Sequence, residues 1–206
     1  MFIPLEYGKF YHIYNRGDNY RNLFFTTQDY LHFLGKYDIY ISSVADTYAW
    51  CLMKNHFHLL VRIKNEHEIG FLNSEHAYSD NPNLKWKVYF PEQHDKRFKK
   101  KPIPSTHFEH LFNAYARWFN IWHECNGTLF EKNYQRKLAD NMQYFSNLIV
   151  YIHNNPVKHG FVQHSIEYPW TSYKSIKSDK PTKLKRNEVM GCFNTIDNFA
   201  SLYNFL

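Results

Sequence analysis

The segment Trp50-Cys-Leu-Met-Lys-Asn-His-Phe-His-Leu-Leu-Val-Arg-Ile63 decides how the rest of the chain is interpreted. Two apolar runs flank Lys54-Asn55, and side chains alternate faces along a strand, so His56 and His58 would point one way and Phe57 the other. Two imidazoles about 7 Å apart on one rigid strand face can bind a single cation. With 13 His in 206 residues, chance supplies roughly 0.8 such pairs per chain. Other parts of the chain must therefore complete any site.

Length and composition favour one domain with additions. Hydrophobic residues make up 44% of the 206 residues, enough for a real core, and no run of 18 apolar residues could span a membrane. The start, Met1–Glu6, lacks the basic and apolar regions of a signal peptide. Cys51, Cys125 and Cys192 show no paired spacing, which argues against a disulfide framework or a thiolate zinc site. We therefore expect a reduced, cytoplasmic environment and no membrane partner.

The charge balance points toward a polyanionic partner. The formal net charge is +6, and 17 Tyr, 18 Phe and 5 Trp accompany 25 Lys and Arg. Aromatic rings interleaved with cations suit single-stranded nucleic acid, in which bases stack and phosphates are neutralised. An aromatic core beneath a solvated basic surface has the same composition, so composition alone leaves both interpretations open.

Hydrophobic periodicity predicts alternating strands and helices. Strands are expected at residues 10–14, 47–53 and 57–63, the last two forming a hairpin. Helices are expected from near residue 28, over 108–122 and from 142 to about 154. The aromatic stripe of the second helix is expected to be core. Residues 64–106 form a long irregular insertion that is either functional or disordered.

The last predicted helix carries a tyrosine at the border of its apolar stripe. That stripe has the spacing i, i+3, i+4 and i+7, occupied by Phe145, Leu148, Ile149 and Ile152. Tyr151 lies beside it, and Asn155 follows one helical turn later. Pro156 disfavours helical geometry at Asn155, so the helix is expected to end there and loosen that pairing. A tyrosine in such a place is usually a packing residue with its hydroxyl in water.

Four segments together resemble the REP-associated tyrosine transposases, members of the single-tyrosine, His-hydrophobic-His endonucleases. Cys51–Leu60 is similar to their Met-Pro-Asn-His-x-His segment, and Tyr151–Gly160 to their Tyr-Ile-x-x-Asn-Pro-Val segment. Tyr168–Tyr173 resembles their Tyr-Pro-Trp-Ser-Ser-Tyr, and Tyr11–Gly17 their opening strand. The segments occur in family order between about residues 8 and 177.

The departures from the family pattern remove no reactive group. Lys54 stands where Pro is commoner, Thr171 stands where Ser is, and the 64–106 insertion is long. The resemblance implies an α+β fold, a ferredoxin-like antiparallel sheet with helices packed on one face. It places the histidines on a central strand and the tyrosine on a helix that crosses near it. We expect residues 1–177 to form the nuclease domain and residues 178–206 a tail with a short packed helix.

The resemblance also implies a chemistry. His56 and His58 would hold a divalent cation, Mg²⁺ or Mn²⁺, with Asn155 as the third ligand. Tyr151 would attack the scissile phosphate to give a 5′-phosphotyrosine and a free 3′-hydroxyl. The family's substrates are single-stranded DNA beside short hairpins, the repetitive extragenic palindromes.

Candidate DNA contacts are basic or amide side chains outside this set. They are Asn15, Arg16, Lys96, Arg97, Lys99, Lys100, Lys101, Lys132, Arg136 and Lys137. The cationic run at 96–101 suits phosphate contacts, although charge runs are commonly just solvated. No heptad or other dimer signal is present. The resemblance to the REP-associated family implies a monomer, and a dimer remains an open alternative. Two other functions remain open: a non-catalytic single-stranded nucleic-acid binding module, and a metal-dependent nuclease in which water attacks and Tyr151 takes no part.

Overall fold

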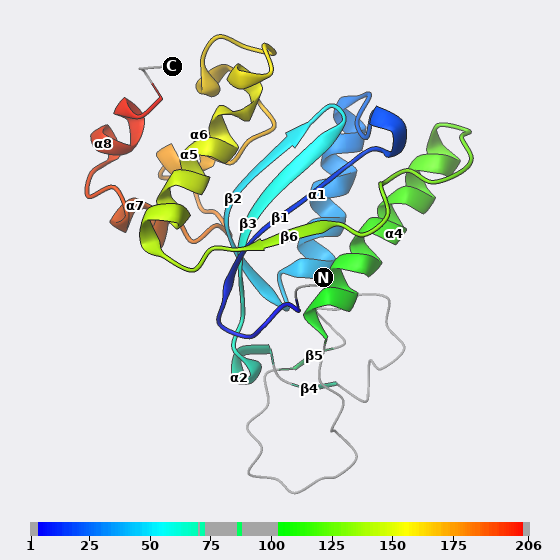
Figure 1. Cartoon of the computed structure of the whole chain (residues 1–206), viewed down its shortest axis with the longest axis horizontal. Coiled ribbons are helices and arrows are strands. Elements are labelled where there is room, and N and C mark those ends of the chain that lie inside the picture. The colour runs from blue at the N-terminus through cyan, green and yellow to red at the C-terminus, as the bar shows by residue number, and fades with distance from the viewer. Residues whose placement is uncertain (1–3, 70, 73–85, 88–102, 204–206) are drawn as a thin grey trace, which may run out of the picture.

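The computed structural model describes residues 4–69, 71–72, 86–87 and 103–203, and Figure 1 traces their arrangement. An antiparallel sheet has the strand order β2-β3-β1-β6, formed by β1 (Phe10–Arg16), β2 (Ala45–Met53), β3 (His56–Ile63) and β6 (Gln135–Leu138). The long helices are α1 (Thr27–Ile41), α4 (Pro104–Trp122) and α5 (Met142–Lys158). Shorter elements are η1 (Asp18–Tyr20), α2 (Glu66–Ile69), β4 (Phe71–Leu72), β5 (Trp86–Lys87), η4 (Ser165–Glu167), α6 (Tyr173–Lys177), α7 (Arg186–Gly191) and α8 (Ile196–Ser201).

The order of these elements is ferredoxin-like. Helix α1 connects β1 to β2, and α4 lies between β3 and β6 along the chain. The central pair of the sheet is β3 and β1, with β2 and β6 at its edges. The predicted α+β fold with an antiparallel sheet is confirmed, and the histidine pair lies on a central strand as expected.

Strand β3 divides its side chains between two cores. Phe57 and Leu59 belong to the core that contains α1 and α4, whereas Leu60 belongs to the core beneath α5. Successive side chains of a strand point to opposite faces, so His56 and His58 share the α5 face with Leu60. The apolar residues of β3 thus anchor the sheet from both sides and fix which face carries the histidines.

Helices cover both faces of the sheet. Helices α1 and α4 pack on one face, as in the ferredoxin-like unit, and α5 crosses the other (Figure 1). Strand β2 is apolar on both faces, since Leu52 joins the α1–α4 core while Cys51 and Met53 join the α5 core. Leaving the second face bare would expose that apolar surface to water. The prediction of helices on one face therefore holds for α1 and α4 but omits α5.

Helix α5 begins at a polar cap and ends beyond a proline. The side-chain oxygen of Asn141 accepts a hydrogen bond from the backbone N–H of Tyr144 at 2.8 Å, as a helix cap should. The predicted apolar stripe is buried, which confirms it. Contrary to the expected end near residue 154, the helix continues through Pro156 to Lys158. Pro156 and Asn155 are themselves buried, so tertiary packing outweighs the helix-breaking tendency of the proline.

The residues after 177 pack against α5. Phe199 of α8 is fully buried in the α5 core, and its ring lies edge-on to His153 of α5 at 6.0 Å between centroids. Nδ1 of His153 lies 2.9 Å from the hydroxyl of Tyr203, and Nε2 lies 2.7 Å from Oγ of Ser172. The last described residues therefore contribute to the core that holds the tyrosine-bearing helix. The division at residue 177 stays a prediction.

Replacing Phe199 with Ala should destabilise the protein by about 3–5 kcal/mol, because the substitution leaves a cavity in a fully packed core. Urea unfolding followed by circular dichroism measures this change. Leu202, which is 42% exposed, provides the matched control, and Leu202→Ala should shift the unfolding free energy by about 0.5 kcal/mol or less. Equal effects of the two substitutions would show that this tail does not contribute to the core as described.

Burial of His153 should make the protein less stable in mild acid. Desolvation lowers the pKa of His153 to about 3, whereas a histidine in an unfolded chain titrates near 6.5. Between these two values the unfolded chain binds the extra proton, so stability present above pH 6.5 is lost as the pH falls. We expect the unfolding free energy of wild type to fall more steeply than that of His153→Gln, by about 1.4 kcal/mol per pH unit. Urea unfolding of both proteins between pH 8 and 5 tests this, and parallel slopes would contradict it.

Candidate functional site

The site lies on the α5 face of the sheet, where β1, β3 and α5 meet. The rings of His56 and His58 lie 5.2 Å apart between centroids on β3. His12 of β1 lies beside them, with its Nε2 atom 3.0 Å from Nδ1 of His58. Both His12 and His58 are buried. The pair predicted from the sequence thus becomes part of a cluster of three imidazoles.

Each histidine of the predicted pair has its Nδ1 atom engaged. Nδ1 of His56 lies 2.8 Å from the side-chain oxygen of Asn55. Because an amide oxygen only accepts hydrogen bonds, His56 must carry its proton on Nδ1, which leaves the Nε2 lone pair available. Nδ1 of His58 lies 3.0 Å from Nε2 of His12, and either of these two nitrogens can be the donor. Such contacts are typical of metal-binding histidines, whose second nitrogen is held by a neighbouring group.

Burial keeps all three imidazoles neutral near pH 7. Desolvation, followed by charge repulsion from His159 and Arg16, lowers the pKa of His56 to about 4. Desolvation and Lys137 lower the pKa of His12 to about 4, and the pKa of His58 falls well below its usual value, mainly through burial. Neutral imidazoles have a lone pair to give to a cation, so the pair is in the correct protonation state to bind a metal.

Helix α5 places Tyr151 beside the imidazoles. Its ring centroid lies 5.5 Å from that of His58 and 6.0 Å from that of His12, edge-on to both. The side chain is 38% exposed, so one side of it faces solvent. The ammonium of Lys158 lies 5.2 Å above the tyrosine ring. The tyrosine is therefore both accessible to a substrate and next to the histidine pair.

Asn155 lies one turn beyond Tyr151 and presents an unused acceptor. Its Nδ2 atom donates a hydrogen bond to the carbonyl of Tyr151 at 2.8 Å. Its Oδ1 atom is buried and has no hydrogen-bond partner among the residues that the structure describes. An unpartnered buried oxygen is costly unless a ligand meets it. Two imidazoles and an amide oxygen are suitable ligands for Mn²⁺ or Mg²⁺, so these residues fit the cation that the sequence predicts.

Aspartate, glutamate and cysteine do not contribute to this set. Within residues 4–69, 71–72, 86–87 and 103–203, the structure contains no group of three or more His, Cys, Asp or Glu side chains arranged to hold a metal. The amide of Asn155, with its unpartnered oxygen, is a candidate for the third protein ligand. Solvent or substrate oxygens would complete the coordination shell, as is usual for Mg²⁺.

The sequence interpretation missed two histidines at the site. His12 lies in the quoted opening strand, but no role was predicted for it. His159 follows Asn155 by four residues, and its ring lies 5.0 Å from that of His56. One signal could have identified each residue: His12 alternates with Tyr14 on one strand face, and His159 repeats the helical spacing of Tyr151 and Asn155.

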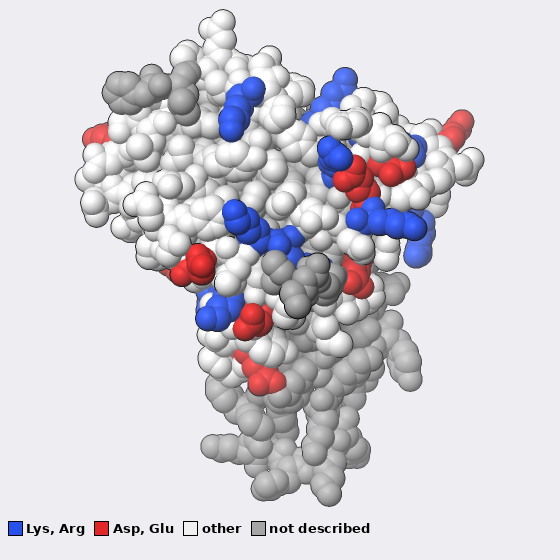
Figure 2. Space-filling model, viewed as in Figure 1, with Lys and Arg blue, Asp and Glu red and all other residues white. Residues whose placement is uncertain are grey.

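Strand alternation separates the candidate DNA contacts. Lys137 of β6 pairs with His12 and is exposed on the histidine face, where its ammonium lies 4.8 Å above the ring of Tyr144. Lys132 is exposed, and Arg16 forms a 2.5 Å ion pair with Glu131. The remaining basic candidates, Lys96, Arg97, Lys99, Lys100 and Lys101, lie outside the described residues. On the face drawn in Figure 2, Lys and Arg lie in several separate groups, some of them beside acidic residues.

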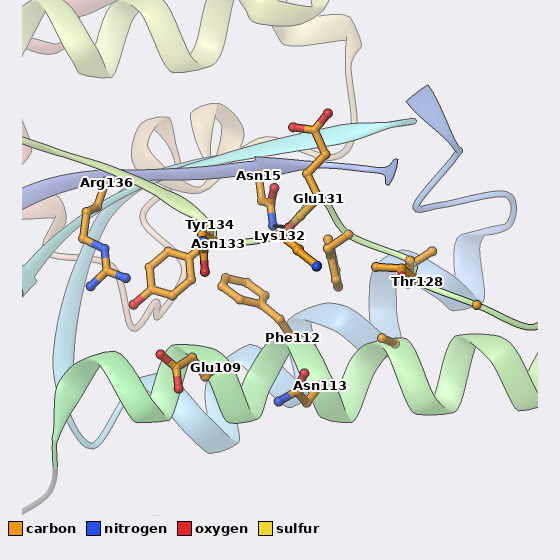
Figure 3. A pocket seen from close by; sticks show the side chains of 14 residues that line it. Asn15, Glu109, Phe112, Asn113, Thr128, Glu131, Lys132, Asn133, Tyr134 and Arg136 are labelled. Carbon is orange, nitrogen blue, oxygen red and sulfur yellow. Dashed lines mark hydrogen bonds between the residues drawn. The ribbon is translucent and has the colours of Figure 1, made fainter. Parts of the chain in front are cut away.

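Asn15 and Arg136 are buried, at 6% and 8% exposure, and point to the α4 face, away from the histidines. The guanidinium of Arg136 lies 4.2 Å from the ring centre of Tyr134. Both residues line a cavity of about 460 Å³ between α4 and residues 127–136 (Figure 3). Alternate residues of β6 point to opposite faces of the sheet, so Arg136 lies on the α4 face while Lys137 lies on the histidine face. A phosphate contact by Arg136 stays a prediction.

Among the residues that the structure describes, no helix combines the length and apolar character needed to cross a bilayer.

Comparisons with known proteins agree with the fold. No family model matches the sequence, and no curated protein matches it significantly. One solved structure, of a REP-associated tyrosine transposase bound to a REP hairpin, matches with a TM-score of 0.59 and 13% sequence identity. The match covers 85% of this chain and 82% of that chain. At this identity the likeness concerns the fold, and the chain has the fold of the REP-associated tyrosine transposases.

Proposed function

We propose that the protein is a single-strand DNA endonuclease and strand transferase in which Tyr151 is the nucleophile. The observation that carries this proposal is the position of the Tyr151 ring, edge-on to His58 at 5.5 Å and partly open to solvent. A tyrosine that only packed the helix would not need two neutral imidazoles and an unpartnered amide oxygen beside it. The similarity in fold to a transposase supports the same reaction class.

His56, His58 and Asn155 are the residues that would hold a divalent cation. A bound Mg²⁺ or Mn²⁺ supplies Lewis-acid polarisation of the scissile phosphate and stabilises the charge that develops on it. The protein's own contribution is a fixed pair of Nε2 lone pairs on a central strand and an amide oxygen on the facing helix. All three donors lie on the same side of the sheet as the tyrosine.

Tyr151 would carry the covalent step. Its hydroxyl oxygen loses a proton and forms a bond to phosphorus, while the bond from phosphorus to the 3′-oxygen breaks and that oxygen takes up a proton. The ammonium of Lys158 lies 5.2 Å above the ring of this tyrosine. Because the phosphodiester energy is kept in the 5′-phosphotyrosine, a second 3′-hydroxyl can displace the tyrosine and rejoin the strands.

Single-stranded DNA next to a hairpin is the proposed substrate. The structurally similar transposase is described as bound to a REP hairpin, and Lys137 is exposed on the same face as the histidines. A lysine there would contact backbone phosphate and set the register of the strand without reading its sequence. We further propose that residues 1–177 carry the activity and that the protein acts as a monomer.

A cleavage assay separates this function from its alternatives. Protein, Mn²⁺ or Mg²⁺, and 3′-labelled single strands bearing candidate hairpins are incubated and resolved on a denaturing gel. Transfer of the labelled 3′ fragment to a protein-linked band supports tyrosine chemistry. Free cleaved fragments without that band indicate attack by water, and DNA binding without cleavage indicates a binding module. Either of the last two results would overturn the proposal.

A further inference from the structure

We infer that His12 is a positioning residue: it sets the tautomer of His58 and so prepares His58 to bind the cation. This inference rests on the proposed function. The starting observation is the 3.0 Å contact between Nε2 of His12 and Nδ1 of His58, made between two buried rings on adjacent strands. A hydrogen bond between two neutral imidazoles has one donor and one acceptor, and its direction decides which nitrogen of His58 carries the proton.

Only one direction leaves His58 able to bind a metal through its outward nitrogen. If His12 donated from Nε2, the proton of His58 would lie on its own Nε2, and that atom would have no lone pair to offer. If His12 accepts, His58 carries its proton on Nδ1 and its Nε2 is free. We assign the second arrangement, in which His12 carries its own proton on Nδ1 and accepts at Nε2.

The other histidine of the pair supports this assignment. Asn55 accepts from Nδ1 of His56 at 2.8 Å, which leaves Nε2 of His56 free. With His12 accepting from His58, both histidines have the same tautomer, and both Nε2 atoms become available together. His12 then does for His58 what the amide of Asn55 does for His56.

His12 is not one of the proposed cation ligands. Its Nε2 atom is engaged with His58, and no three-residue His, Cys, Asp or Glu metal group occurs among the described residues. Its ring also lies 4.7 Å from that of Tyr14 and 6.0 Å from that of Tyr151, between centroids. Those contacts hold the imidazole in place between the strand pair and the tyrosine helix.

Two substitutions of His12 separate a positioning role from simple packing. His12→Leu fills the space but removes the acceptor, whereas His12→Gln keeps an acceptor oxygen at about the position of Nε2. Mn²⁺ affinity of the metal-free protein, measured by calorimetry, should fall about 10–100-fold in His12→Leu and should be largely restored in His12→Gln. His107→Leu is the matched control, since His107 is also buried but contacts the carbonyl of Tyr40 on α1 at 3.0 Å.

A second readout needs no metal. Nitrogen-15 NMR of the metal-free protein should show the proton of His58 on Nδ1 in wild type and in His12→Gln, and should show loss of that preference in His12→Leu. Unfolding curves identify any variant that does not fold. If His12→Leu does not fold, the spectra of wild type and His12→Gln still show which nitrogen of His58 carries the proton.

The outcomes distinguish this inference from the proposed function. If wild type binds no Mn²⁺, the metal part of the proposed function fails, and the NMR spectra alone decide the role of His12. A proton on Nε2 of His58 in wild type would overturn the inference. Wild-type Mn²⁺ affinity in a folded His12→Leu would overturn it as well, while leaving the proposed function intact.

Discussion

Tyr151→Phe is expected to abolish the protein–DNA adduct and to reduce cleavage by at least about 10³-fold, because the phenylalanine ring has no oxygen to attack phosphorus. The ring contacts with His58 and His12 do not involve the hydroxyl, so the variant should fold and bind the cation normally. The measurement is the yield of protein-linked 3′ fragment on a denaturing gel under single-turnover conditions.

Tyr144→Phe is the matched control for that substitution. Tyr144 lies on the same helix, is partly buried and carries Lys137 above its ring, but it lies near the start of α5. Removing the hydroxyl of Tyr144 should leave adduct formation within about twofold of wild type. If Tyr151→Phe cleaved DNA at the wild-type rate, the attacking group would have to be something other than Tyr151.

Removing either histidine of the pair is expected to have an effect of similar size. His56→Ala and His58→Ala each delete one proposed nitrogen ligand, and we expect cation-dependent cleavage to fall by about 10²–10³-fold. Single-stranded DNA binding, measured by fluorescence anisotropy, should change little, because neither side chain carries a charge at neutral pH. Raising the Mn²⁺ concentration should recover part of the lost rate if the defect lies in metal affinity.

His110→Ala provides the control for the histidine variants. His110 is exposed on α4, which packs on the opposite face of the sheet, so its loss should leave both cleavage and cation dependence unchanged. Normal cleavage by both His56→Ala and His58→Ala would mean that the pair does not hold the reactive cation.

Periodicity predicted the framework of the site because it reflects burial. The alternation in β3 placed His56 and His58 on one face, and the i, i+3, i+4 spacing of α5 identified the stripe that packs on the sheet. Both patterns are local, so they can be read from neighbouring residues alone. The fold is confirmed by the structure and by the structural comparison, and the roles of the site residues stay predictions.

What the sequence could not predict depends on contacts between distant segments. His12 and His58 are separated by 46 positions and meet only through strand pairing. The end of α5 was placed too early because the preference of Pro156 is local, whereas its burial depends on the tertiary fold. The burial of Arg136 was not predicted, because the register of β6, which places this residue on the α4 face, cannot be read from a four-residue strand.

The apolar stripe of α5 has a consequence for the geometry of the chemistry. The histidines are fixed to the sheet, whereas Tyr151 and Asn155 are fixed to one turn of the helix and joined by a hydrogen bond of 2.8 Å. Leu148 and Ile152 are buried in the core that packs between α5 and the sheet, and we expect the volume of these side chains to influence the distance between the two halves. Changing the volume of these side chains would move Tyr151 and Asn155 together relative to the imidazoles. Reactions that depend on the positions of bound groups are sensitive to displacements of about 1 Å. A buried apolar residue of α5 can thus affect the reach of the proposed nucleophile.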